Sequence, residues 1–323
     1  SIFNKNVQPI EMTATFLERN FGAENFYTTN PTFNEYEETQ NSLLAFSTTF
    51  KKNKLKIQPR IYWKRNQDLF LLRRNEPGFY RNMHISNKVG VETNASYASK
   101  LGITGFGVEL SEIYLRSNNL GNRSRFMSNV FLEHRFSIAD NKLDITPGVA
   151  LTYFSDFKFR AFPGLDIGYD LTNTFKVYGN IGYTYRIPTY TDLFYNDPVT
   201  SGNEDLEPEE AFAQELGLKY TSPKFNASVA VFNRDADNLI DFIRNDVSED
   251  VFVATNITEV NTKGLELDAA YNFRFKDYTQ TLSVGYAFLD DNILDQNEFE
   301  PWQTSVADLN FDNEFTEMEE VLR

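Results

Sequence analysis

The side chains that most often carry catalysis and metal binding are sparse in this sequence. It contains no cysteine and two histidines, His84 and His134, which lie far apart along the chain. A zinc centre needs several imidazole or thiolate ligands, so neither a zinc site nor thiol catalysis is expected. There is no nucleophile elbow and no glycine-rich phosphate loop. We therefore predict that the chain is not an enzyme and that it has no cofactor and no metal centre.

One acidic stretch could still bind a cation. The sequence DADNLIDFIRNDVSED, residues 235–250, places several carboxylates in a short run. Carboxylate oxygens suit calcium, but the ligand spacing and the turn glycine of an EF-hand are missing. Loop-bound calcium stays open, and a solvated acidic face is the default interpretation.

The charge of the chain argues against a nucleic-acid partner. The formal net charge is −15, whereas phosphate backbones are bound by basic surfaces. The nearest candidate is KRNQDLFLLRR, residues 64–74, which could contact an anion or form a solvated loop. No stretch approaches the roughly 20 apolar residues of a membrane helix. The opening SIFNKNVQPI lacks the pattern of a signal peptide, and none is expected in this chain.

Apolar and polar residues alternate over most of the chain, which is the side-chain period of a β-strand. One face of segment 263–275 is apolar and comprises Leu265, Leu267, Ala269, Tyr271, Phe273 and Phe275. We count about thirteen such segments. They span residues 10–17, 38–50, 54–66, 86–98, 101–114, 124–137, 142–154, 158–171, 174–186, 211–221, 224–235, 263–275 and 278–290.

The lengths of these segments and of their connections indicate a membrane barrel. Several segments exceed ten residues, whereas soluble strands usually have about five or six and tilted membrane strands about nine to eleven. Short turns alternate with long links at 67–85, 115–123, 187–210 and 236–262. Outer-membrane barrels have short periplasmic turns and long extracellular loops. We predict an all-β fold, an antiparallel up-and-down transmembrane β-barrel; a large soluble β protein is the alternative.

Three residues interrupt the expected strands. Pro59 and Pro147 lie inside strand patterns, although proline cannot donate to a ladder. The apolar face of segment 101–110 also shifts near Gly105. We predict a β-bulge at each position.

The segment from 182 to 220 resembles the signature of TonB-dependent outer-membrane transporters. The matching residues are Tyr185, Arg186, Pro188, Leu193, Phe194, Gly202, Asn203, Leu206, Pro208, Glu209, Glu215 and Gly217. A later element, NITEVNTKGLELDAAY, matches through Asn256, Asn261, Gly264 and Glu266. We expect these residues to build the barrel and its rim rather than to contact ligand. Arg186 and Glu215 are expected to pair, because an unpaired inner charge is costly.

The first third of the chain suggests a narrower resemblance. NFGAENFYTTNPTFNEYEETQ and KLGITGFGVELSEIYLRSNNLG are similar to cobalamin (vitamin B12) receptors of the BtuB-like group of Bacteroidota. The resemblance implies uptake of a scarce nutrient, with cobalamin as the expected ligand, at the bacterial outer membrane. It also implies surrounding lipid, a TonB complex acting through a plug domain, and a surface lipoprotein as a possible partner. The alternatives are a siderophore or haem receptor and a non-transporting surface binding or structural barrel.

The resemblance also places domains and ligand contacts. Residues 1–290 are expected to supply strands and loops of a barrel of about 22 strands, with the plug and early strands outside this chain. Residues 291–323 are expected to form an extracellular loop and an acidic tail. Bulky, partly apolar ligands favour concave aromatic sites. The predicted ligand-binding residues are Phe70, Arg73, Arg74, Phe79, Tyr80, Tyr190 and Tyr195.

Overall fold

The computed structural model describes residues 9–23, 33–244, 251–257 and 259–293. Two compact units divide the chain, residues 1–182 and 183–323, and each is described by itself. The predicted tail, 291–323, lies almost wholly outside the described residues. Among the described residues, no helix has the length and apolarity needed to cross a membrane.

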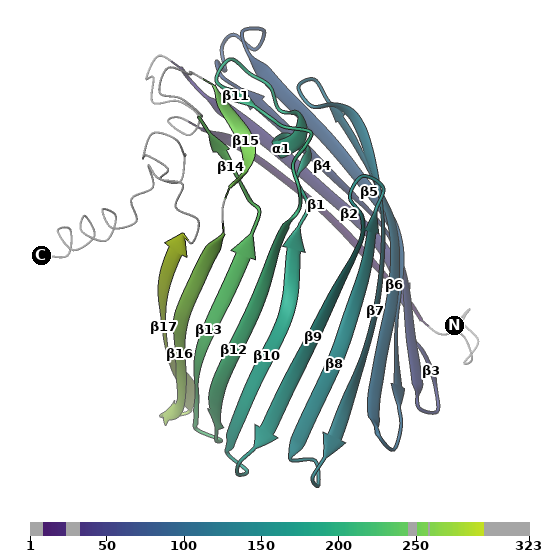
Figure 1. The fold of residues 1–323 in the computed structure, drawn as a ribbon, viewed down its shortest axis with the longest axis vertical. Helices are drawn as coiled ribbons and strands as arrows, with labels where there is room; N and C mark the ends of the chain where they lie inside the picture. The colour runs from purple at the N-terminus through teal and green to yellow at the C-terminus, as the bar shows by residue number, and fades with distance from the viewer. Residues whose placement is uncertain (1–8, 24–32, 245–250, 258, 294–323) are drawn as a thin grey trace, which may run out of the picture. The chain divides into compact units, whose positions relative to one another are not determined.

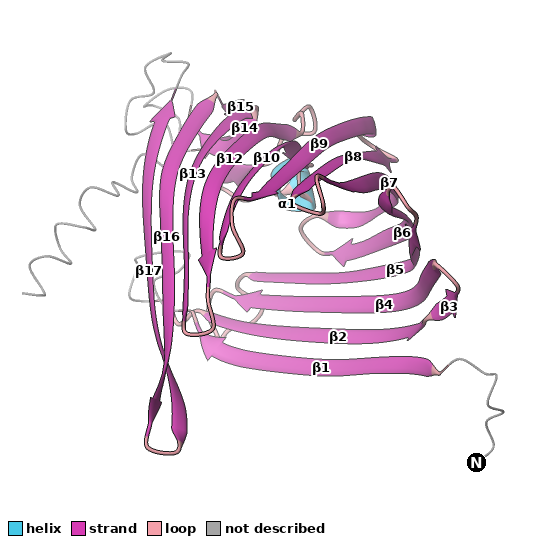
Figure 2. Cartoon of the chain, turned by 90° about the horizontal axis from the view of Figure 1, so that it is seen from below, coloured by secondary structure: helices cyan, strands magenta, loops and turns pink. Residues whose placement is uncertain are grey.

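The first unit is built from antiparallel strands that follow one another in chain order (Figure 2). β3 pairs with β4, and the remaining order is β1-β2-β4-β5-β6-β7-β8-β9-β10. The strands are β1 (Ile10–Gly22), β2 (Tyr36–Thr48), β3 (Phe50–Lys52), β4 (Leu55–Leu71), β5 (Arg81–Ala98), β6 (Gly102–Ser117), β7 (Gly121–Ile138), β8 (Leu143–Phe154), β9 (Lys158–Asp170) and β10 (Phe175–Arg186), whose last residues belong to the second unit.

The second unit continues the same plan and adds a small sheet and a one-turn helix (Figure 1). Its long antiparallel strands are β12 (Glu209–Thr221), β13 (Phe225–Asp237), β16 (Val260–Phe275) and β17 (Tyr278–Ile293). The helix is α1 (Tyr190–Phe194). The small sheet contains β11 (Thr200–Ser201), β14 (Leu239–Ile243) and β15 (Phe252–Ile257).

Every predicted span corresponds to a strand, and several strands extend further toward the long links. β4 continues to Leu71 and β5 begins at Arg81, so the predicted link 67–85 is reduced to 72–80. The predicted link 115–123 is a short hairpin, because Ser117 pairs with Gly121. The apolar alternation fades in these extensions, which explains why the sequence pattern ended early.

The bulge predicted at Pro59 is wrong. On one side Pro59 stands opposite Thr93 in an unbroken ladder with β5. On the other side the pairing stops after Ser47–Arg60 and resumes at Phe50–Ile57 in the same register. No extra residue is inserted, so the missing proline donor is accommodated by a pause in the ladder rather than by a bulge.

The predictions at Pro147 and Gly105 are corrected in the same way. Pro147 pairs with Leu165 on β9, and the β7–β8 ladder skips its position and resumes in register. Gly105 lies in unbroken ladders, opposite Ser96 on one side and Glu133 on the other. The register of the whole ladder therefore overrides the local sequence signals.

The two faces of the strands differ in polarity, and the apolar face is the exposed one. On β5, the apolar Val89 and Val91 share one face and expose 41% and 49% of their surface. On the other face of the same strand, Lys88 pairs with Glu109 of β6 at 3.0 Å, and the Tyr62 hydroxyl donates to the same carboxylate. Apolar residues outside and polar networks inside are the pattern of a transmembrane barrel. The chain is therefore all-β and forms part of an antiparallel up-and-down β-barrel.

Candidate functional site

Arg186 connects the end of β10 to the start of β12. Its Nε donates to Glu209 Oε2 at 2.6 Å and its Nη2 to Oε1 at 2.5 Å. Its Nη1 donates to Asp192 Oδ2 at 3.1 Å. Two parallel bonds from one guanidinium to one carboxylate make a strong and directional pair. The expected partner Glu215 is wrong, because Glu215 lies further along β12, opposite Phe232.

The carboxylate of Asp192, which binds Arg186, also caps the one-turn helix α1. The Thr189 hydroxyl accepts from the backbone N–H of Asp192 at 3.1 Å, and Asp192 Oδ2 accepts from the Thr189 N–H at 2.8 Å. This reciprocal pair is a capping box. Asp192 therefore caps the helix and binds Arg186 with one oxygen, which ties α1 to the end of β10.

Gly202 lets the following loop pass very close to this helix. Its N–H donates to the Tyr195 carbonyl at 2.6 Å, and the Asn203 N–H donates to the Asp192 carbonyl at 2.9 Å. A β-carbon at position 202 would lie 2.7 Å from the carbonyl carbon of Leu193 and from the nitrogen of Phe194. Since these atoms are backbone, a side chain here requires the chain to move.

Asn256 lies on β15 and binds two other segments, the residues just before β12 and those just before β14. Its Nδ2 donates to the carbonyls of Glu207 at 2.9 Å and Asn238 at 2.8 Å, and its Oδ1 accepts from the Glu207 N–H at 2.8 Å. The Ile240 N–H donates to Glu209 Oε1 at 2.8 Å. We call Arg186, Asp192, Gly202, Glu209 and Asn256 the rim cluster; its contacts support a structural role.

The other motif residues surround this cluster or lie on the strands. The buried ones are Pro188, Leu193, Leu206, Pro208, Gly217, Asn261 and Gly264. Tyr185, Phe194, Asn203 and Glu215 are half-buried, and Glu266 is exposed. Asn261 Nδ2 donates to Asn233 Oδ1 at 2.8 Å. Sequence reasoning missed Asp192, although its place three residues after Thr189 is a capping signal.

The predicted ligand residues of the first unit gather around the link 72–80. The Arg73 guanidinium lies 3.8 Å from the ring centroid of Phe79 and 5.3 Å from that of Phe33. Arg73 also pairs with Glu76 at 3.0 Å. Phe79 is 53% exposed, so one aromatic surface backed by a cation faces solvent. We call Phe33, Arg73, Glu76 and Phe79 the loop cluster.

Three further predicted residues lie beside the loop cluster. The Arg74 guanidinium lies 4.2 Å from the ring centroid of Tyr36. Phe70 and Tyr80 make an edge-on aromatic contact at 6.4 Å. Phe70 is only 7% exposed, which leaves it to support the link from beneath. Sequence reasoning missed Phe33 and Tyr36, whose partners are distant in the chain.

Tyr190 and Tyr195 belong to the second unit, where both are half-buried on α1 and at its end. The Tyr190 ring lies 6.2 Å from that of Phe194. The seven predicted ligand residues thus fall into two groups, one near residues 70–80 and one at α1.

The stretch considered for calcium is only partly described, because residues 245–250 lie outside the described ranges. Asp235 accepts from Asn233 at 2.8 Å, and Asp241 accepts from the Phe242 N–H at 2.7 Å. Within the described part of the chain, no three acidic, histidine or cysteine side chains group as metal ligands. Calcium binding stays a prediction.

The chain belongs to the TonB-dependent receptor-like β-barrel family, whose profile matches residues 3–316. This match agrees with the order of the strands and with the signature found in residues 182–220. The family and its fold are those of receptors and transporters, and the barrel fold implies an outer-membrane protein.

Curated relatives share part of the sequence. The vitamin B12 transporter BtuB of Photobacterium profundum is 31% identical over 109 residues, which are 33% of this chain and 18% of that protein. The BtuB of Vibrio vulnificus (strain CMCP6) is 26% identical over 162 residues, or 50% of this chain and 25% of that protein.

Solved structures share the fold. The siderophore receptor PirA from Pseudomonas aeruginosa superposes with a TM-score of 0.72 at 15% identity, covering 88% of this chain and 54% of that one. The FrpB iron transporter from Neisseria meningitidis gives 0.68 at 13% identity, covering 94% and 54%. The chain therefore spans about half the length of the solved receptors that it matches.

Proposed function

We propose that the protein containing this chain takes up cobalamin across the outer membrane. The observation that carries the proposal is the match to two proteins named as vitamin B12 transporters, one of them 31% identical over 109 residues. The similarity of the first third of the sequence to cobalamin receptors is in line with these matches. The solved siderophore and iron receptors share 15% and 13% identity, so they inform the fold alone.

The loop cluster offers contacts that suit such a ligand. Cobalamin is large and has both apolar and amide-bearing surfaces, which favours exposed aromatic rings with polar groups nearby. Phe79 is exposed at 53%, and Arg73 beneath it holds the ring in place. The proposal therefore assigns Phe79 as a direct contact and Arg73 as its support.

The partners in transport follow from the same assignment. Energy would come from a TonB complex acting on a plug domain, and a surface lipoprotein would assist capture of the ligand. Both are proposals for the whole protein, since this chain covers about half of its solved relatives.

Isothermal titration of the detergent-solubilised protein with cyanocobalamin tests the ligand. We expect saturable binding with a dissociation constant of about 1 μM or below. Ferric siderophores and haem serve as parallel titrations. Tighter binding of one of those would replace cobalamin as the ligand, and no binding by any of the three would favour a surface barrel without transport.

The role of the loop cluster has a matched test. Phe79→Ala should weaken cobalamin binding about tenfold, as expected for loss of a central aromatic contact. Phe159→Ala is the control, because Phe159 is 74% exposed on β9 and lies outside the loop cluster. Equal affinities for both variants would remove Phe79 from the site.

A further inference from the structure

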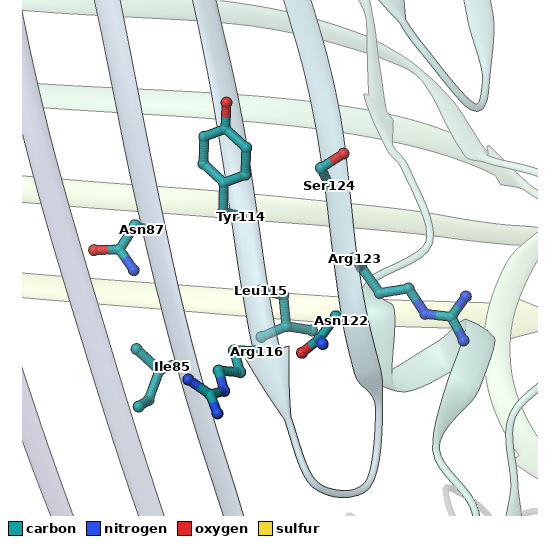
Figure 3. Close-up of a pocket in the computed structure, with 8 residues that line it drawn as sticks. All are labelled: Ile85, Asn87, Tyr114, Leu115, Arg116, Asn122, Arg123 and Ser124. Atoms are coloured by element: carbon teal, nitrogen blue, oxygen red, sulfur yellow. The ribbon is translucent and has the colours of Figure 1, made fainter.

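A polar pocket opens on β5, β6 and β7 beside the hairpin 118–120. It is a shallow, open depression with a volume of about 460 Å³. Its walls include Ile85, Asn87, Tyr114, Arg116, Asn122 and Ser124. Figure 3 shows Arg116 between Ile85 and Asn122, which are also its register partners on the neighbouring strands.

The pocket lies on the lipid-facing side of these strands. Side chains alternate along a strand, so Arg116 and Tyr114 share a face with Leu110 and Val108. Leu110 and Val108 are 41% and 40% exposed. The pocket therefore lies on the lipid-facing side, between its apolar part and the hairpin.

The lipid-facing side changes from apolar to polar over a few residues. Beyond Leu110 the face of β6 carries Glu112, Tyr114 and Arg116. On β4 the same step leads from Ile61 through Trp63 to Arg65. The Trp63 indole donates to Asn87 Oδ1 at 3.1 Å. Aromatic residues followed by polar ones mark the level of lipid headgroups.

Two arginines on the lipid-facing side at this level, Arg65 and Arg116, have no carboxylate partner among the described residues. Arg123 also lines the pocket, and its Nε donates to the Leu120 carbonyl at 3.0 Å. Arg65 donates to the neutral Gln67 at 3.0 Å. Arg116 is exposed and has no side-chain hydrogen bond or ion pair in the described structure, where Glu112 shares its face without pairing to it. Both register partners of Arg116 are uncharged.

We propose that this pocket binds the phosphate of a phosphorylated lipid headgroup in the leaflet on the side of the long loops. A guanidinium binds phosphate through two parallel hydrogen bonds. The amides of Asn87 and Asn122 and the hydroxyl of Ser124 supply further donors around it. Tyr114 and Trp63 lie at the boundary between the headgroup and the acyl chains.

Native mass spectrometry of the protein in detergent micelles tests the site with three probes. These are phosphorylated lipid A, its dephosphorylated form and inorganic phosphate. We expect retention of the phosphorylated lipid only, and about tenfold weaker retention by Arg116→Gln, with a further loss in Arg65→Gln/Arg116→Gln. Arg274→Gln is the matched control, because Arg274 is an exposed arginine at the opposite end of a strand.

Each other outcome overturns the proposal. Equal retention of both lipids would show that the acyl chains alone are recognised. If the double variant retains the lipid as the unmodified protein does, and its circular dichroism shows that it is folded, the lipid binds elsewhere. Inorganic phosphate binding as tightly as the lipid would identify a site for free phosphate rather than a headgroup.

Discussion

Arg186 binds two carboxylates, and each of them also accepts a hydrogen bond from a backbone N–H. Asp192 caps α1, and Glu209 receives the N–H of Ile240 at the start of β14. Because Glu209 has only 12% of its side chain exposed, its charge depends on these donors. At the residue scale, the arginine therefore links a strand end, a helix and the small sheet of the second unit.

Replacing Arg186 by alanine should destabilise the folded protein. Glu209 would keep one backbone donor, and we expect a loss of about 1–3 kcal/mol in the free energy of unfolding. The partly solvated guanidinium favours the lower part of this range. Urea unfolding in micelles, followed by circular dichroism, measures it.

The control for this prediction is Arg274→Ala. Arg274 contacts Asp277 at 3.7 Å, and their side chains are 72% and 95% exposed. An exposed pair of this kind contributes little, so we expect a change within about 0.5 kcal/mol. Equal losses in the two variants would contradict a special role for the rim cluster.

At the scale of elements, aromatic rings lie across from glycines on neighbouring strands. Phe232 stands opposite Gly264, and a β-carbon at that glycine would overlap the ring. Tyr62 and Gly90 repeat the arrangement, with 2.5 Å between such a β-carbon and the ring. A ring packed on a glycine covers the exposed backbone and fixes the register of the pair. This explains the glycine in the family element that contains Gly264.

Gly264→Ala should therefore cost about 1–3 kcal/mol by overpacking. Phe232→Leu introduced with it should recover much of the loss, because the smaller side chain leaves room for the methyl group. The double-mutant cycle is measured by urea unfolding in micelles.

Gly148→Ala is the control for this cycle. A β-carbon at Gly148 would lie 3.4 Å from Glu133 Cβ, which is an ordinary contact. We expect a much smaller loss there. Additive effects of the Phe232 and Gly264 substitutions would show that the ring does not set the glycine requirement.

At the scale of the whole molecule, the exposed apolar faces determine the solvent that the protein needs. On β17, Phe288 is 54% exposed and Val284 64% exposed. Large apolar patches in contact with water favour aggregation. We expect a β-rich, monodisperse protein in detergent micelles and precipitation when detergent is diluted below its critical micelle concentration. Circular dichroism and gel filtration test this; a monodisperse species in plain buffer would contradict the lipid-facing assignment.

Much of the strand order could be predicted because the side-chain period is a local property. Segment 263–275 alternates in the sequence, and β16 spans Val260–Phe275. The links were less predictable. The structure places α1, β11, β14 and β15 within links expected to be irregular. These elements depend on distant contacts such as Asn256 to Glu207, which no local pattern records.

In the candidate site, too, some features followed from the sequence and others depended on contacts between distant segments. Phe79 was predicted from its type and its place in a long link, and the structure leaves it exposed. Phe70 was predicted on the same grounds but is buried under Tyr80. The partner of Arg186 is Glu209 rather than Glu215, and Glu209 is the first residue of β12, two residues before the predicted segment 211–221.

By itself the sequence determined the all-β class, the alternation of faces and the family, because each is encoded by period or by ordered motifs. Only the tertiary structure decided the ladder register past Pro59 and Pro147, the partner of Arg186 and the pocket around Arg116. Register and cross-strand neighbours arise when segments distant in the chain align, so they are properties of the assembled sheet.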